Sequence, residues 1–304
     1  MTIDLPAAGT RTAPTPSHVA ADVTRRGGRS PRRTRRTGVV VGVALTVVCL
    51  LMVAPFLWAA FSSVKPTDVA FANPPVFSFA PTFQPYVDLW QTTDFYLYLI
   101  NTLVVAVIST IVALLIGLPC AYALSRYGGV SSLVLLILAL VFRALPRFAV
   151  VLPMYEISKS LGIYDTTYAL AAALIAINQP FSIWLLRNFF AEIPNTLDEA
   201  AMIDGCTRFQ VLRRVMVPLM GPGILTAGIF VFLFAFQEYL TAAVLTDTTS
   251  KTVPVFIATQ LGQNLPLLQQ ASAATVLLTL PVIGIALIAQ KYLVAGLASG
   301  AVKG

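Results

Sequence analysis

Six long apolar runs follow one another along the chain, and each is long enough to cross a bilayer as a helix of about 20 residues. A β-barrel strand would instead alternate apolar and polar side chains. Prolines inside or near the runs are tolerated where neighbouring helices satisfy the freed backbone groups. The pattern predicts an all-α integral membrane protein with six transmembrane helices, at approximately 39–61, 98–124, 131–151, 166–186, 224–245 and 271–292.

Composition agrees with this class. Only 11% of the residues are charged and 57% are apolar, whereas a soluble domain carries about 25% charged residues. The first run is longer than the ~7–15 apolar residues of a cleaved signal peptide. Residues 1–37 are rich in Arg, Pro, Thr and Ala without apolar periodicity, which predicts a disordered cytoplasmic tail. Residues 38–304 then form one transmembrane domain.

The basic residues predict the orientation. With the amino terminus inside, 15 of the 20 lysines and arginines lie on the cytoplasmic side and 3 on the other, while Arg143 and Arg147 fall inside the third run. This asymmetry predicts a multi-pass protein of the cytoplasmic membrane with both termini in the cytoplasm. Eight arginines crowded before the first run are typical of a cytoplasmic flank next to membrane lipid, so we expect no nucleic-acid partner.

Two connecting segments are too long to be simple turns: an external one over 62–97 and a cytoplasmic one over 187–223. In the cytoplasmic segment, Thr196 with Glu199 has the spacing of a capping box, which predicts a helix start. Gly205 stands where that helix needs a left-handed residue to end.

A second capping box, Thr207 with Gln210, predicts a second helix that Pro218 ends or kinks. The spacing of its apolar residues predicts one face made of Phe209, Leu212 and Met216. From the residues alone, two interpretations have equal weight: a pair of amphipathic helices on the bilayer surface, or a docking element for a partner.

Several kinds of chemistry are missing from the sequence. No G-x-x-x-x-G-K-[ST] motif occurs, so the chain has no P-loop for ATP phosphates. The single histidine, His18, lies in the tail, and the three cysteines are far apart in the sequence: Cys49, Cys120 and Cys206. We therefore expect no catalytic residues, no metal site and no disulfide framework.

Four ordered motifs resemble one family. Glu199-Ala200-Ala201 with Asp204-Gly205 is similar to the E-A-A-x-x-D-G loop of carbohydrate-type ABC-importer permeases. Val217-Pro218-Leu219 follows the loop as in that family. The other matches are Ser63-Val64-Lys65-Pro66 after the first run, Asn101-Thr102-Leu103 at the start of the second, and the ending Leu297-Ala-Ser-Gly-Ala-Val-Lys-Gly304, which resembles that of maltose-type second permeases.

The resemblance implies a type I ABC-importer permease fold with a cytoplasmic coupling helix, and a transport subunit rather than an enzyme. Its partners would be a second permease, an ATPase homodimer and an extracytoplasmic solute-binding protein. No cofactor is expected in this chain, since ATP and Mg would bind the ATPase. Glu199 has two possible roles, capping carboxylate or ion pair with the partner. The implied coupling residues are Glu199, Ala200, Ala201, Asp204, Gly205, Thr207 and Phe209.

Polar residues inside the apolar runs mark a possible translocation path, because such groups normally face protein or a water-filled cavity. The candidates are Arg143, Arg147, Asn178, Gln179, Gln237 and Glu238. Interhelical hydrogen bonds are the alternative for Asn178, Gln179 and Glu238. Arg143 and Arg147, four residues apart, would share one helix face. We expect Arg143 to pair with Glu238 or to face solute; snorkelling to the interface is the alternative.

Where the family usually has W-N-[DE] in the fifth span, this chain has Phe236-Gln237-Glu238, so the acid alone is retained. Two other function classes are weighed against the importer. An ion-coupled secondary transporter would use the charges inside the spans, but such proteins are often built from internal repeats, and none is evident here. A non-transporting scaffold would not need those charges. The particular sugar does not follow from the sequence.

Overall fold

The computed structural model describes residues 31–70, 72–261 and 267–301, with the side chains of 38–70, 72–260 and 268–290. The chain divides into two compact units, Met1–Pro55 and Phe56–Gly304. Helix α1 (Pro31–Ser63) contains the apolar stretch Gly38–Ser63. Its start at Pro31 lies inside the segment for which we expected a disordered tail. Residues 1–30 and the last three residues of the Gly-Ala-Val-Lys-Gly ending lie outside the described residues.

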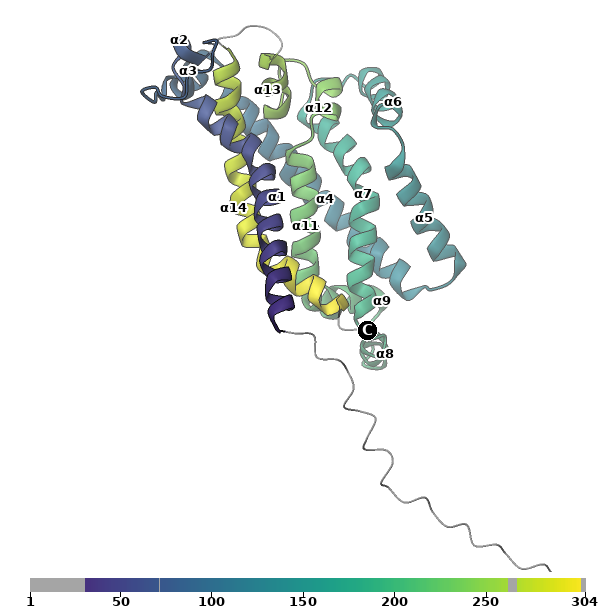
Figure 1. Cartoon of the computed structure of the whole chain (residues 1–304). Helices are drawn as coiled ribbons and strands as arrows, with labels where there is room; N and C mark the ends of the chain where they lie inside the picture. The colour runs from purple at the N-terminus through teal and green to yellow at the C-terminus, as the bar shows by residue number, and fades with distance from the viewer. Residues whose placement is uncertain (1–30, 71, 262–266, 302–304) are drawn as a thin grey trace, which may run out of the picture. The chain divides into compact units, whose positions relative to one another are not determined.

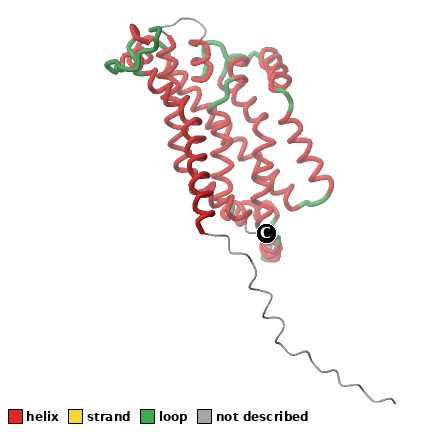
Figure 2. Tube along the Cα trace, viewed as in Figure 1, coloured by secondary structure: helices red, strands yellow, loops and turns green. Residues whose placement is uncertain are grey.

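The described residues form helices and no strand (Figure 1, Figure 2). After α1 come α2 (Thr67–Ala70), α3 (Gln84–Thr92), α4 (Phe95–Arg126), α5 (Val130–Ala144), α6 (Arg147–Ser160), α7 (Thr167–Glu192), α8 (Thr196–Ile203), α9 (Arg208–Val211), a π-helical turn (Leu212–Met216), α10 (Val217–Leu219), α11 (Gly221–Phe236), α12 (Leu240–Leu245), α13 (Val253–Leu261) and α14 (Leu267–Ala301).

Four of the described helices are long and apolar enough to span a membrane: Gly38–Ser63, Phe95–Arg126, Thr167–Glu192 and Leu268–Gln290. Two bent helix pairs also pass this test, Val130–Ala144 with Arg147–Ser160 and Arg208–Leu219 with Gly221–Phe236. Six spans result if each bent pair is one crossing. The all-helical membrane class is thus as predicted, but two of the spans are broken.

The third predicted run, 131–151, is not one helix. Helix α5 ends at Ala144 and α6 begins at Arg147, with an angle of 87° between them. The cause is local: Pro146 disfavours the helical conformation for the residue before it, and Leu145 is extended, with φ −60° and ψ 146°. Arg143 and Arg147 therefore belong to different helices, and the prediction that they share one helix face was wrong.

The fifth predicted run, 224–245, is also interrupted. Helix α11 ends at Phe236, and a short connection through Gln237 and Glu238 leads to α12. At its other end, α11 follows α10 at an angle of 82°. This helix thus begins at a sharp corner and ends inside the predicted run, whereas hydropathy alone predicted one continuous crossing.

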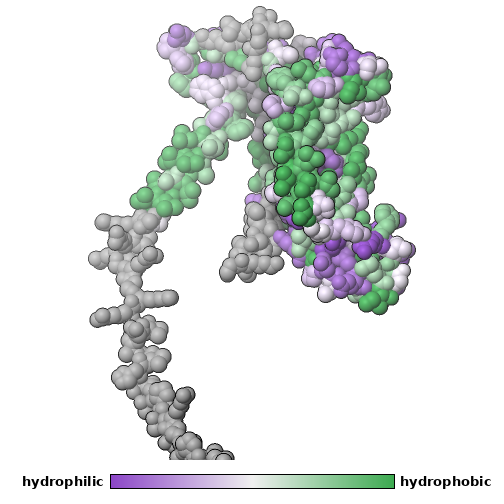
Figure 3. Space-filling view, turned by 90° about the vertical axis from the view of Figure 1, so that its right-hand side faces the viewer, coloured by the Kyte–Doolittle hydropathy of each residue, from purple (hydrophilic) through white to green (hydrophobic). Residues whose placement is uncertain are grey.

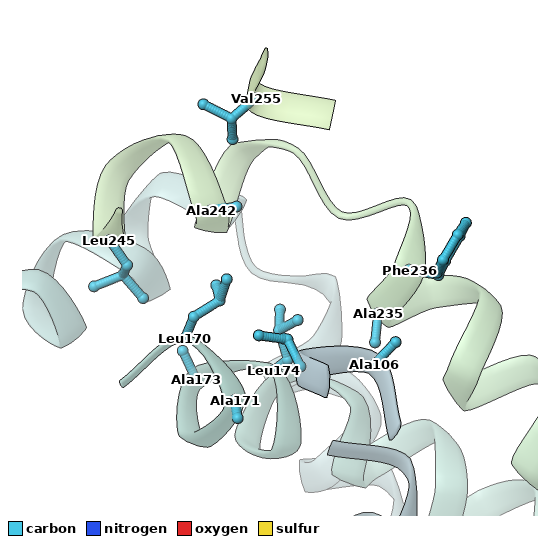
Figure 4. Packing of buried hydrophobic residues seen from close by; sticks show 11 residues of the cluster. Ala106, Leu170, Ala171, Ala173, Leu174, Ala235, Phe236, Ala242, Leu245 and Val255 are labelled. Atoms are coloured by element: carbon cyan, nitrogen blue, oxygen red, sulfur yellow. The ribbon is translucent and has the colours of Figure 1, made fainter. Parts of the chain in front are cut away.

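Close contact between α4 and α7 forms the centre of the larger unit, and α11 packs against both. Small residues allow the approach: a Cβ atom at Gly117 of α4 would lie 2.9 Å from Ser182 Oγ of α7. One buried cluster joins Leu170 and Leu174 of α7 to Phe236 and Leu245 (Figure 4). Figure 3 shows apolar residues gathered along the helices and hydrophilic residues toward both ends, as expected for a membrane-spanning unit.

A single carboxylate ties two loops together at the end of the unit where α6 and α12 lie. Asp165, with φ 55°, precedes α7, and its side chain accepts hydrogen bonds from the amides of residues 247–250 at 2.8–3.1 Å. The hydroxyls of Thr249 and Ser250 add bonds of 2.8 and 2.9 Å. Partial burial by itself would raise the pKa of Asp165. The hydrogen bonds lower the pKa by more than burial raises it, and they hold it well below the ordinary value of 3.8.

Replacing Asp165 by Asn tests this junction. Asn tolerates a positive φ as Asp does, so the variant Asp165→Asn removes the charge and leaves the backbone unstrained. We expect a loss of about 1–3 kcal/mol, measured as a lower thermal midpoint of the purified complex at pH 7.

The pH dependence has a definite sign. Because the folded pKa is depressed, the stabilisation by Asp165 is fully present above its unfolded pKa, about 3.9, and is lost as the pH falls below it. The gap between wild type and Asp165→Asn should stay constant from pH 7 to about 5 and narrow below about 4. A gap that closes already at pH 6 would contradict the assignment.

Candidate functional site

The first candidate site is the segment from α8 to α10. Helix α8 ends in a Schellman motif: the amide of Cys206 donates to the Ala201 carbonyl at 3.0 Å, and that of Gly205 to the Met202 carbonyl at 3.1 Å. Gly205 has φ +87°, which confirms the predicted left-handed corner. A Cβ atom there would meet no other atom of the described residues within 4 Å, so glycine is needed for its conformation and not for space within this chain.

The predicted capping box at Thr196 and Glu199 is wrong. The residue before the helix is Asn195, and no side chain caps it. The amide of Glu199 instead donates to the backbone carbonyl of Asn195 at 3.2 Å. Thr196 therefore lies inside the first turn, and the Glu199 carboxylate is left exposed. Of the two roles considered for Glu199, only the partner contact remains open.

The second predicted capping box is confirmed. Thr207 Oγ1 accepts from the Gln210 amide at 3.4 Å, and Gln210 Oε1 accepts from the Thr207 amide at 2.8 Å. The helix that follows passes through a π-helical turn and continues beyond Pro218 to Leu219. Pro218 lacks an amide and its ring crowds the preceding turn. The helix ends one residue beyond it, before a bend of 82° into α11, so Pro218 marks the end of the helix as predicted.

This segment has one face that is buried against the rest of the chain and one that is exposed. Ala201, Leu212 and Met216 are buried against α4 and α7. Phe209, which we predicted on the same apolar face as Leu212 and Met216, is 69% exposed. Its helix is only four residues long before the π turn, so the expected spacing does not persist. The exposed members of the predicted coupling set are Glu199, Ala200, Asp204, Gly205, Thr207 and Phe209.

Exposed apolar side chains gather around this corner, which is unusual for a surface facing only water. Ile203, the last residue of α8, is 87% exposed, and Leu197 and Met202 are also exposed. Together with Phe209 they lie on the two short helices that flank Gly205. We call these four residues the apolar corner.

A buried ion pair holds α8 in place, and our sequence analysis missed it. Arg126 Nε of α4 lies 2.8 Å from Asp198 Oδ2, and both side chains are less than 10% exposed, at 7% and 8%. The Tyr122 hydroxyl donates to the other oxygen of Asp198. Arg126 also donates to the Phe190 carbonyl near the end of α7, at 3.1 Å. One guanidinium thus joins α4, α7 and α8.

The signal for this pair in the sequence is weak. Arg126 follows the second apolar run and Asp198 lies next to Glu199 in the loop motif, 72 positions further on. Arg126 looks like an ordinary cytoplasmic flanking residue, and Asp198 looks like a favourable acid in the first turn of a helix. A buried acid in an otherwise exposed short helix becomes visible only in three dimensions.

The second candidate site contains the polar residues inside the spans. The guanidinium of Arg143 lies against two rings that contact each other, 4.9 Å from the centroid of Phe181 and 5.1 Å from that of Phe234. The expected pairing of Arg143 with Glu238 is absent. Glu238 Oε2 lies instead 3.8 Å from Arg147 Nη2, because the break at Leu145 and Pro146 points the two arginines away from a common face.

Glu238 also serves its own helix. Its Oε1 accepts from the Thr241 amide at 3.1 Å and from the Thr241 hydroxyl at 2.8 Å, at the start of α12. Gln237 is exposed. Gln179 donates to the Ala113 carbonyl of α4 at 3.2 Å, the interhelical bond that we considered as an alternative. Asn178 is buried, and its Oδ1 has no hydrogen-bond partner among the described residues.

A cavity of about 630 Å³ lies elsewhere in the larger unit, between α4, α11 and α14. Its lining includes Leu114, Ile224, Phe232 and Ile285 and is almost entirely apolar, so it offers no polar group to orient a solute. In the part of the chain that the structure describes, no group of three or more His, Cys, Asp or Glu residues would hold a metal ion.

Comparisons with known proteins agree on one family. The sequence model described as "Binding-protein-dependent transport system inner membrane component" matches residues 113–299. The "Probable ABC transporter permease protein y4oR" of Sinorhizobium fredii is 36% identical over 84% of this chain and 92% of its own length. The "Trehalose transport system permease protein SugB" of Mycobacterium tuberculosis is also 36% identical, over 85% of this chain and 95% of its own.

A third relative is the "Trehalose/maltose transport system permease protein MalG" of Thermococcus litoralis, 33% identical over 89% of this chain and 98% of its own length. Among solved structures, a chain of a bacterial ABC transporter involved in the import of the acidic polysaccharide alginate matches with a TM-score of 0.73. It is 23% identical and the match covers 86% of this chain and 98% of that one. That likeness shows the fold.

The Arg126–Asp198 pair generates a test of how α8 is held. Removing one partner leaves a buried charge uncompensated, which costs about 3–5 kcal/mol. Arg126→Gln and Asp198→Asn should each lower the thermal midpoint of the purified complex and speed protease cleavage within 194–207. The double variant should recover part of the loss. Additive losses in the double variant would show that the two residues are not coupled.

Proposed function

The chain belongs to the family of binding-protein-dependent transport system inner membrane components, and we propose that it is one of two permease subunits of an ATP-driven carbohydrate importer. As a member of that family it is a transport subunit and not an enzyme. The relatives are named as permease proteins of ABC or other transport systems, which favours the importer over the alternative of an ion-coupled secondary transporter.

The observation that carries the proposal is the exposed corner at Gly205, together with the Arg126–Asp198 pair that attaches α8 to α4. A docking element needs an exposed surface that a partner can cover. It also needs a rigid attachment to the rest of the chain, so that movement of the partner is transmitted. The apolar corner supplies the first, because its side chains are exposed. The Schellman motif, the Thr207 capping box and the buried ion pair supply the second.

The proposed partner at this corner is an ATPase subunit, one of a homodimer that binds ATP and Mg. This chain has no P-loop, so the energy must come from another polypeptide. The exposed Glu199 carboxylate and the apolar corner would contact a cleft of that partner. Closure of the ATPase dimer would move α8, and Arg126 would transmit this displacement to the ends of α4 and α7, which it bonds directly.

The orientation proposed from the basic residues is compatible with this role. Arg208, Arg213 and Arg214 are exposed around the corner, as the positive-inside rule expects for a cytoplasmic face. Both termini would then be cytoplasmic. The opposite end, which carries α6, α12 and the Asp165 junction (Figure 1), would face an extracytoplasmic solute-binding protein.

The proposed solute is a carbohydrate, since relatives are named for trehalose and trehalose/maltose transport. The path would pass between this chain and a second permease, along Arg143, Arg147, Asn178, Gln179, Gln237 and Glu238. Aromatic rings beside Arg143 support such a path, because flat apolar faces pack against the C–H groups of sugars.

The corner itself can be tested with Gly205. A β-branched residue at φ +87° is strained by more than the about 1–2 kcal/mol that an ordinary L-residue loses in this region. Gly205→Val should therefore unwind the corner and reduce ATP-driven uptake at least tenfold, while insertion and assembly of the complex persist. Normal uptake by this variant would refute the docking assignment.

A matched variant separates conformation from space. Gly205→Asn adds a side chain but tolerates the left-handed region. If the conformation alone matters, Gly205→Asn should retain most of the uptake. Loss of uptake with an intact corner would instead locate a close approach of the ATPase at this residue. The measurements are uptake in proteoliposomes and co-purification of the ATPase.

A further inference from the structure

The aromatic clamp around Arg143, formed by Phe181 and Phe234, leaves part of its guanidinium without a partner. The guanidinium carbon lies 4.9 and 5.1 Å from the two ring centroids, which are themselves 5.1 Å apart with the rings at 73° to one another, so both rings lie on one side of the group. Nη1 is enclosed by the protein, yet it has no hydrogen-bond partner among the described residues. A guanidinium bonds through its edge, and stacking leaves that edge available for a planar acceptor. A buried donor left without a partner carries a desolvation cost, so its acceptor is expected to come from outside this chain.

The charge around the clamp is also unbalanced. Arg143 forms no ion pair among the described residues, and Arg147 is near enough to repel it. Glu238 is the acid that approaches this region, but its Oε1 is occupied by Thr241 and its Oε2 faces Arg147 at 3.8 Å. The pair of Glu238 and Arg147 is neutral, which leaves the charge of Arg143 uncompensated.

A purely structural role explains less of this geometry. An arginine that anchors the span would extend its guanidinium to the water layer and bond there. Here the group lies against rings of α7 and α11, with its Nη1 shielded. Hydroxyl groups of a neutral sugar would satisfy the donors, but they would leave the charge uncompensated at membrane depth, where compensation matters most.

We propose that the aromatic clamp is a subsite for an anionic substituent on the transported sugar, such as a carboxylate, which Arg143 binds through its edge. This inference rests on the proposed function and narrows its solute class to acidic sugars. A carboxylate would accept two parallel N–H bonds from the guanidinium, and the rings beside it would contact the apolar face of the sugar.

The test uses a reporter thiol in the complete transporter. The native cysteines Cys49, Cys120 and Cys206 are first replaced, and Gln237→Cys, three residues beyond Phe234 and exposed, becomes the probe. Its rate of modification is measured with an anionic sulfonatoethyl and a cationic trimethylammonioethyl methanethiosulfonate. Removing a nearby positive charge with Arg143→Gln should lower the anionic-to-cationic rate ratio roughly tenfold. Arg143→Lys, which keeps the charge, should largely preserve it.

A matched control distinguishes local from general effects. Gln91→Cys, also exposed but on α3, should show the same rate ratio with Arg143 and with Arg143→Gln. Two results would overturn the proposal. One is a Gln237→Cys thiol that reacts with neither reagent, since the clamp would not adjoin an aqueous path. The other is a ratio at Gln237→Cys that Arg143→Gln leaves unchanged.

The solute class is tested by protection of the same thiol. Galacturonate should slow its modification in the wild-type background and fail to do so in Arg143→Gln, whereas galactose at equal concentration should have no effect. Equal protection by both sugars, or by neither, would overturn the acidic-sugar assignment. Failure of the proposed function would appear separately, as normal uptake by Gly205→Val or the absence of a co-purifying ATPase.

Discussion

The ion pair between Arg126 and Asp198 is the interaction on which the arrangement of the larger unit depends. It connects the end of α4 to α8, and the same guanidinium bonds the Phe190 carbonyl of α7. Pulling α8 away would leave two buried charges apart, at a cost of about 3–5 kcal/mol. The guanidinium therefore couples α8 to the ends of α4 and α7, which is the property that the proposed docking element requires.

The two candidate sites differ in how completely their polar groups are bonded. Beneath the apolar corner, the charge of Asp198 is matched by Arg126 at 2.8 Å, and both capping groups of Thr207 and Gln210 are paired. Between the spans, Arg143 Nη1 and Asn178 Oδ1 are enclosed without partners among the described residues, and Arg143 has no opposite charge beside it. A buried ion pair resists separation, whereas an unmatched charge suits a place where another molecule completes the bonding. The contrast fits a transmitting element at one site and a binding element at the other.

Sequence reasoning succeeded where the cause is local and periodic. Hydropathy predicted the helices, and the turn chemistry of Gly205 and the Thr207 capping box predicted two details of the loop. It failed where two acceptors compete for one donor, as at Thr196: the Glu199 amide donates to the Asn195 carbonyl and not to the Thr196 side chain. It also failed where the partner is distant in the chain, as for Arg126 with Asp198, because a pairing across 72 positions leaves no periodic trace.

The breaks in the spans explain two of the polar residues that made the sequence unusual. Backbone groups freed at membrane depth need polar partners. The break between α5 and α6 brings Arg147, and the break between α11 and α12 brings Glu238, whose carboxylate accepts from the Thr241 amide of α12 and faces Arg147. These two residues serve the interruptions themselves and join one to the other. Arg143 has no such task, since it lies before its break and its guanidinium bonds no carboxylate among the described residues. Of these three charged residues, Arg143 is the one whose charge the breaks leave unexplained, and the proposed anionic subsite is placed there for that reason.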